Sequence, residues 1–322
     1  MKLNKLFGIG TLLLAFGAQA AYPEKNIVMT VPFAPGGSTD MLARLVAAGL
    51  QKQLGQSVVV ENVGGAGGTL GAVKVAKANP DGYSLLMTNM GIATAPTLYK
   101  NLAFDPLKDF EYIGQTGDIP MLMVSRPGLS VKTLKDLVTY AKANPGKATI
   151  AHAGVGSSSQ LCSLLFQKMI ATDLNTIPYK GTGPAMTDVV GDRIDMMCDQ
   201  ALSVNAFAQA GKVNAVAVVG SQPVASLPNV PLTSKQAEFK EFDLTVWNGL
   251  YAPKGTPKEI VDALAKALAA AVVDPEFKRK LGEQGAFPPS AQAATPMGLK
   301  NHVASELAKW APILKSAGVY AD

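Results

Sequence analysis

Glycine and hydroxyl residues gather in short loops that each follow an apolar run and precede a helical pattern. The first is "PFAPGGSTD" at residues 32–40, and "GGAGG" at 64–68, "GVGSSS" at 154–159 and "KGTG" at 180–183 repeat its order. Free backbone N–H groups at a helix N-terminus carry partial positive charge, so such loops favour anions. Alternatively, Ser38, Thr39 or Asp40 only caps a helix, which contributes about 1 kcal/mol.

Nucleotide binding and acyl transfer lack their motifs. The phosphate-loop pattern G-x-x-x-x-G-K-[ST] is absent, and the loop after Phe33 lacks the third glycine of G-x-G-x-x-G. G-x-S-x-G is missing around Ser157 and Ser158, and His and Asp partners for them are not placed by the sequence. We therefore predict no catalytic residue and a carboxylate held by neutral donors, namely backbone N–H groups and the hydroxyls of Ser38, Thr39, Ser157 and Ser158.

The elements that position these loops alternate between strand and helix. An apolar run at 27–33 precedes an amphipathic pattern at 39–54, and similar pairs recur from about residue 121. Such alternation predicts an α/β fold with two lobes, each a mostly parallel sheet flanked by helices, with the ligand in the cleft between the lobes. The helical patterns at 258–273, 276–284 and 300–317 are expected to pack back on the first lobe.

The N-terminus has the pattern of a signal peptide. Two lysines precede an apolar run at 6–16 and a small-x-small sequence at 18–20. We expect residues 1–20 to be removed near Ala20-Ala21 and the mature protein to enter the periplasm. No later segment has 18 uninterrupted apolar residues.

Composition narrows the chemistry further. Without the two leader lysines, 27 basic residues face 24 acidic ones, and their scattered positions do not favour nucleic acid. Only two histidines are present, so neither a metal site nor a cofactor is expected. Cys162 and Cys198 are compatible either with a disulfide or with two buried thiols.

Several long segments resemble one known family. They are "YPEKNIVMTVPFAPGGSTDMLARLVA", "GQSVVVENVGGAGGTLGAVKVAKANPDGYSLLM", "DFEYIGQ", "HAGVGSSSQL", "IPYKGTGPAMTDVVGDRIDMMCD" and "YAPKGTPKEIVDAL". They are similar to the Bug-type (Bordetella uptake gene) solute receptors, which are the binding components of tripartite tricarboxylate transporters. The resemblance covers nearly the whole mature chain, and the pair "PFAPGGSTD" and "NVGGAGG" is its most diagnostic part.

The resemblance implies a periplasmic-binding-protein fold, type II-like, with a discontinuous first lobe at 21–121 and 244–322 and a second lobe at 122–243. Loop backbone and hydroxyl groups are then expected to bind the ligand. In the first lobe the implied residues are Phe33, Ala34, Pro35, Gly36, Gly37, Ser38, Thr39, Ala66, Gly67 and Gly68. In the second lobe they are Gly156, Ser157, Ser158, Tyr179, Lys180, Gly181 and Asp199.

Some positions have two interpretations. Gln160 and His152 depart from the His and Ser common in the family, and together with Asn89 they are further candidates for ligand contact. His152 is also typical of a strand-end histidine bonded to backbone. Asp199 would repel a carboxylate, so it either orients a loop as an acceptor or meets an amino group. Lys180 either attracts the acid or lies on the surface.

The expected function is therefore that of a non-enzymatic receptor. It would capture a small aliphatic or aromatic di- or tricarboxylate and deliver it, as a monomer, to permease subunits in the inner membrane. A secreted serine hydrolase acting through Ser157 or Ser158, and a ligand-sensing input to a signalling system, are the alternatives. Which acid is bound does not follow from the residues.

Overall fold

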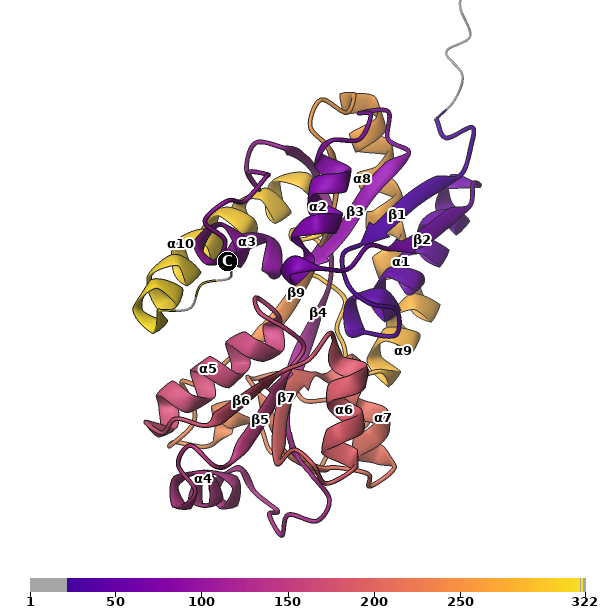
Figure 1. Cartoon of the computed structure of the whole chain (residues 1–322). Helices are drawn as coiled ribbons and strands as arrows, with labels where there is room; N and C mark the ends of the chain where they lie inside the picture. The colour runs from indigo at the N-terminus through magenta and orange to yellow at the C-terminus, as the bar shows by residue number, and fades with distance from the viewer. Residues whose placement is uncertain (1–21, 319, 321–322) are drawn as a thin grey trace, which may run out of the picture.

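The computed structural model of this chain describes residues 22–318 and residue 320. The expected signal peptide lies outside this range. A nine-stranded sheet runs in the order β2-β1-β3-β9-β4-β7-β5-β6, with β8 also paired to β4 (Figure 1). Its strands are β1 Ile27–Val31, β2 Val58–Asn62, β3 Ser84–Asn89, β4 Phe110–Ser125, β5 Thr149–His152, β6 Asn175–Pro178, β7 Met196–Gln200, β8 Asn214–Val219 and β9 Thr245–Pro253.

Helices cover the sheet on both faces. The α-helices are α1 Ser38–Leu54, α2 Thr69–Ala76, α3 Gly91–Leu98, α4 Leu134–Ala143, α5 Ser158–Ile170, α6 Thr182–Val190, α7 Ala201–Gln209, α8 Lys258–Val273, α9 Pro275–Glu283 and α10 Pro296–Ala317. Two 3-10 turns, η1 Ala66–Gly68 and η2 Thr233–Lys235, complete the elements of the described residues. None of the helices in this part of the chain combines the length and apolarity needed to span a bilayer.

The long strand β4 joins two groups of elements. It pairs with β9 as far as Pro120 and with β7 and β8 from Met121 onward. The first group contains β1–β3, β9, α1–α3 and α8–α10, and the second contains β5–β8 and α4–α7. β4 runs through both groups, and β9 lies beside its first part (Figure 1).

The sheet is more mixed than the strand–helix alternation predicts. β1 is parallel to β2 and β3, and β5 is parallel to β6 and β7, as expected. β9 is antiparallel to β3 and β4, and β4 is antiparallel to β7 and β8. The reason is that the chain crosses between the groups once outward on β4 and once back on β9, and these neighbouring crossings must run in opposite directions.

Side chains of β4 contribute to the core on both faces. Met121 and Met123 belong to one buried apolar cluster, whereas Leu122 and Val124 belong to the other, as the two-residue period of a strand requires. Each cluster includes residues from both groups, so the core is continuous across the crossing strands.

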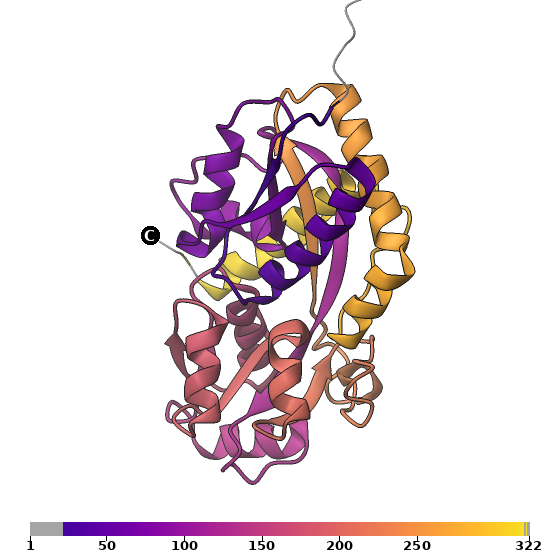
Figure 2. The same cartoon turned by 90° about the vertical axis from the view of Figure 1, so that its right-hand side faces the viewer.

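The C-terminal helices return to the first group, as the sequence predicts. α8 packs along α1, and α10 packs on α3 and β4 (Figure 2). The approach of α8 to α1 depends on Gly49, where an added Cβ would lie 2.8 Å from the Ala271 Cβ.

A disulfide joins Cys162 to Cys198, with their Cα atoms 5.9 Å apart. Both cysteines are fully buried. The bond therefore ties α5 to β7 inside the second group and decides between the two states left open by the sequence.

Candidate functional site

Four loops each connect the end of a parallel strand to the start of a helix. We number them loop 1 (residues 32–37), loop 2 (63–68), loop 3 (153–157) and loop 4 (179–181). Loops 1 and 2 belong to the first group, and loops 3 and 4 belong to the second. The carboxyl ends of parallel strands are the common position of ligand sites in such sheets.

The structure brings these loops together across the two groups. An added Cβ on Gly67 would lie 2.8 Å from the Val155 carbonyl oxygen, and one on Gly181 would lie 3.8 Å from the Ala34 Cβ. The Ser38 hydroxyl donates to the Ser203 Oγ at 2.9 Å. Residues more than 80 positions apart thus meet at one place.

Loops 1 and 3 are held by the same kind of hydrogen bond. The Gly36 N–H donates to the Asp40 carboxylate at 2.9 Å, and the Gly156 N–H donates to the Gln160 Oε1 at 2.7 Å. In both cases the acceptor lies four residues later, in the first turn of the helix. Asp40 and Gln160 are therefore loop supports, and the Gln160 oxygen is already engaged.

Asp40 makes further contacts that fix loop 1. It accepts from Asn62 Nδ2 at 2.9 Å and from two guanidinium nitrogens of Arg44 at 3.0 and 3.1 Å. Burial alone would raise the pKa of the Asp40 carboxyl, but the hydrogen bonds from Arg44, Gly36 and Asn62 hold it below its usual value.

Most of the helices at these loops begin without a side-chain cap. Gly37, Gly68 and Gly181 occupy the N-cap positions of α1, α2 and α6, whereas Ser157 caps α5 by accepting from the Gln160 N–H. No hydrogen-bond partner for the Ser38 N–H occurs among the described residues. Uncapped helix N-termini leave donors and a partial positive charge for an anion.

The predicted site residues differ in exposure. Ala34, Pro35, Gly36, Ala66 and Lys180 are exposed, and Phe33, Gly37, Gly67, Ser157, Gln160, Tyr179 and Gly181 are partly exposed. Ser38, Thr39, Gly68, Asn89, His152, Gly156, Ser158 and Asp199 are buried.

Hydroxyl and amide groups at the bottom of loop 1 bond to protein partners. Thr39 Oγ1 accepts from Asn89 Nδ2 at 3.2 Å, and Asn89 Oδ1 accepts from the Gly91 N–H. Asn89 thus positions Thr39 and the start of α3. The Ser38 hydroxyl is likewise engaged, so the free donor at this residue is its backbone N–H.

The residues of a serine hydrolase are not assembled here. Ser157 Oγ donates to the Gly154 carbonyl at 2.6 Å, and Ser158 Oγ accepts from Gln200 Nε2 at 3.2 Å. His152 Nδ1 lies 3.0 Å from the Gly154 carbonyl oxygen, and burial lowers the pKa of its imidazole. His152 is therefore a strand-end histidine bonded to backbone.

Tyr179 and Asp199 act within the second group. The Tyr179 hydroxyl donates to Asp188 at 2.7 Å. Asp199 accepts from Thr182 Oγ1 at 2.5 Å and from the Gln200 N–H at 2.7 Å. Burial raises the pKa of Asp199 to about 6. Asp199 thus fixes the start of α6 to the end of β7, which matches its interpretation as a loop-orienting acceptor.

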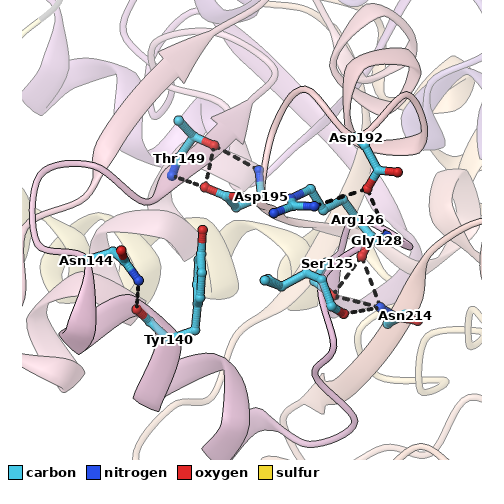
Figure 3. A network of polar contacts seen from close by, with 10 residues as sticks. Ser125, Arg126, Gly128, Tyr140, Asn144, Thr149, Asp192, Asp195 and Asn214 are labelled. Carbon is cyan, nitrogen blue, oxygen red and sulfur yellow. Dashed lines mark hydrogen bonds and ion pairs between the residues drawn. The ribbon is translucent and has the colours of Figure 1, made fainter.

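The four arginines of the chain are all paired with acidic side chains. Arg44 pairs with Asp40, Arg193 with Asp188 and Arg279 with Glu283. Arg126 contacts Asp192 and Asp195 beside Thr149, at the start of β5 (Figure 3), whereas loop 3 follows the other end of that strand. Apart from the exposed Lys180 in loop 4, an anion at the loops would therefore meet backbone and neutral donors.

Sequence reasoning did not identify Gln200 and Ser203, which lie at the end of β7 and in α7. Ser203 Oγ donates to the Gln200 carbonyl at 3.0 Å and receives the cross-group hydrogen bond from Ser38. Helix α7 itself was not predicted; it is a short helix of nine residues, and its N-cap residue Gln200 makes no side-chain capping hydrogen bond. The position of Gln200 directly after Asp199 was the available hint.

The fold and the loops define a protein of the periplasmic-binding-protein class. The model of the tripartite tricarboxylate transporter family receptor (TctC) matches residues 42–319. The chain belongs to this family. It is 43% identical over 301 residues to the UPF0065 protein in the TAR-I ttuE–ttuC′ intergenic region of Agrobacterium vitis, covering 94% of this chain and 87% of that protein.

Solved structures agree with this assignment. The periplasmic binding protein BugD superposes with a TM-score of 0.88 and 42% identity, over 94% of this chain and all of BugD. MatC from Rhodopseudomonas palustris with bound malate gives a TM-score of 0.85 at 35% identity, over 91% of this chain and all of MatC. Rpa4515 of R. palustris with adipate gives a TM-score of 0.87 at 31% identity, over 93% of this chain and 99% of Rpa4515. The chain is thus a solute-binding receptor rather than an enzyme.

Proposed function

We propose that this receptor binds a small dicarboxylate between loops 1 and 2 on one side and loops 3 and 4 on the other. The observation that carries the proposal is the meeting of these loops at helix N-termini, three of which lack a side-chain cap, while every arginine is already paired with an acidic side chain. Malate and adipate in the related structures are both dicarboxylates, which supports the ligand class.

The ligand would lie between two lobes that move on the crossing strands. We assign residues 21–121 and 244–322 to one lobe and 122–243 to the other, since β4 changes partners between Pro120 and Met121. A dicarboxylate held at one end by each lobe binds the closed arrangement better than the open one, so its occupancy favours closure.

Membership of a tripartite transporter receptor family supports delivery of the ligand to a permease. The receptor is exported by a signal peptide over residues 1–20 and acts in the periplasm as a monomer. It passes the acid to inner-membrane permease subunits by transient contact.

The test removes one backbone donor without breaking a helix. Ser38 is the first residue of α1, where proline is tolerated, and Gly37 already has an extended conformation (φ −78°, ψ 164°) that suits a residue before proline. Ser38→Pro removes the N–H, whereas the matched control Ser38→Ala removes only the hydroxyl. Binding of malate and adipate to each variant is measured by titration calorimetry.

We expect Ser38→Pro to lower the affinity for both acids at least tenfold more than Ser38→Ala does, because the ligand carboxylate loses the Ser38 N–H as a hydrogen-bond donor. Circular dichroism and the melting temperature check that both variants are folded. Equal affinities in the two variants would contradict the loop 1 assignment. A wild-type protein that binds neither acid, but binds an amine or sugar, would contradict the ligand class.

A further inference from the structure

Gln200 lies where the two groups of elements meet. It is the last residue of β7, and its Cα pairs with Met121, the first β4 residue beyond the change of partners. Only 6% of the residue is exposed. Gln200 also occupies the N-cap position of α7.

The hydrogen bonds of Gln200 connect the start of α5, which follows loop 3, to the start of α1, which follows loop 1. Its side-chain Nε2 donates to the Ser158 hydroxyl oxygen at 3.2 Å, at the first residue of α5. Its backbone carbonyl accepts from Ser203, which in turn accepts from Ser38 at the first residue of α1. The side chain is thus held beside the helix starts that we propose bind the dicarboxylate.

One atom of this side chain is left without a partner. Gln200 Oε1 is buried, and no donor contacts it in the described part of the chain. A buried acceptor without a donor costs free energy, so the bound state is expected to supply one. A carboxylate has no proton to offer, and its oxygens would be repelled by Oε1.

We propose that Gln200 is a specificity-determining residue whose Oε1 accepts a hydrogen bond from a hydroxyl group on the bound dicarboxylate. This inference rests on the proposed function, and it narrows the ligand class to hydroxy dicarboxylates. A hydroxyl donates to a neutral amide oxygen without needing a counter-charge. The neighbouring Asp199 accepts from Thr182 on one oxygen and from the Gln200 N–H on the other, so both of its oxygens already face protein donors.

Malate and succinate test the proposal because they differ only by one hydroxyl. Their dissociation constants are measured for the wild type, for Gln200→Leu and for Gln200→Met by titration calorimetry, with circular dichroism and melting curves as folding controls. The matched control is Gln160→Leu, since the Gln160 oxygen supports loop 3 through Gly156.

We expect the wild type to prefer malate and Gln200→Leu to lose roughly tenfold in malate affinity, with less than a threefold change for succinate. Gln160→Leu should lower the affinity for malate and for succinate by the same factor. Equal losses of malate and succinate in both Gln200 variants, or a wild type that binds the two acids equally, would overturn the role of Gln200 while leaving the proposed function intact. Absence of binding to every dicarboxylate would overturn both.

Discussion

Asp40 provides the sharpest test of how the structure supports its loops. The carboxylate is almost fully buried and accepts hydrogen bonds from the Gly36 N–H, Asn62 and Arg44. Replacing it in Asp40→Ala leaves these donors without their common acceptor. Loop 1 then loses the contact that fixes its glycine.

The expected cost follows from the exposure of the partners. A hydrogen bond to a charged group contributes about 1.5–3 kcal/mol when buried. The Arg44 side chain is 56% exposed, so its pairing adds no more than about 1 kcal/mol. Because Gly36 is exposed, water can accept the hydrogen bond that its N–H loses with the Asp40 carboxylate. We therefore expect the free energy of unfolding to fall by about 2–3 kcal/mol, and Tm by roughly 4–10 °C.

The assay is thermal and urea unfolding at pH 7, with Gln160→Ala as the matched variant in loop 3. Gln160 supports Gly156 through a neutral amide, so its loss should cost only about 1 kcal/mol. The pKa of Asp40 is lowered in the folded state, so the difference between wild type and Asp40→Ala should be complete at neutral pH and disappear as the pH falls through that pKa. If Asp40→Ala unfolds at the same temperature and urea concentration as the wild type, the Asp40 carboxylate does not hold loop 1.

Three further outcomes follow from other contacts. Burial raises the pKa values of Asp199 and Asp118 to about 6, so the free energy of unfolding should fall as the pH rises from about 4 to 6, and Asp199→Asn should remove about half of that fall. Replacing Cys162 and Cys198 together by serine should lower the free energy of unfolding by about 3–4 kcal/mol in urea titrations, since the bond closes a separation of 36 residues. Gly67→Ala should weaken malate binding in calorimetry by roughly tenfold or more, because its Cβ would lie 2.5 Å from the Tyr99 hydroxyl and 2.8 Å from the Val155 carbonyl oxygen of loop 3, and its φ of 61° disfavours alanine.

Controls separate these outcomes from general damage. Gly55→Ala also places alanine at a positive φ, 72°, but nothing lies within 4 Å of its Cβ, so it should leave malate affinity unchanged. Matching malate affinities for the Gly67 and Gly55 variants would refute the cross-group contact. If the free energy of unfolding of Asp199→Asn changes with pH as that of the wild type does, the prediction for Asp199 is refuted. If replacing Cys162 and Cys198 by serine leaves the urea midpoint unchanged, the prediction for the disulfide is refuted.

The sequence by itself determined the strand–loop–helix units and their chemistry. Residues 258–273 were predicted as a helix with the bounds that the structure gives to α8, because Leu264, Ala267, Leu268 and Ala271 form a regular apolar face. The glycine loops, the absence of nucleotide and hydrolase motifs and the family resemblance also came from local residue order. Such features need no distant partner to be recognised.

Tertiary structure decided what depends on distant partners. The first part of β4 was not predicted, because Gly114, Gly117 and Pro120 interrupt its strand pattern, and pairing with β9 compensates for them. Helix α3 was missed because Gly91 and Pro96 weaken its local signal.

The same limit applies to the site. Residue order brings Asp40 and Gln160 into the first turn of a helix, but the structure alone shows that each accepts from a glycine of the preceding loop. The disulfide required two cysteines 36 residues apart to lie within bonding distance. Gln200 Oε1 is buried without a hydrogen-bond donor because the end of β7 packs against the N-termini of α1 and α5. Burial and hydrogen bonding between distant segments are properties of the packed chain, so the sequence alone does not show them.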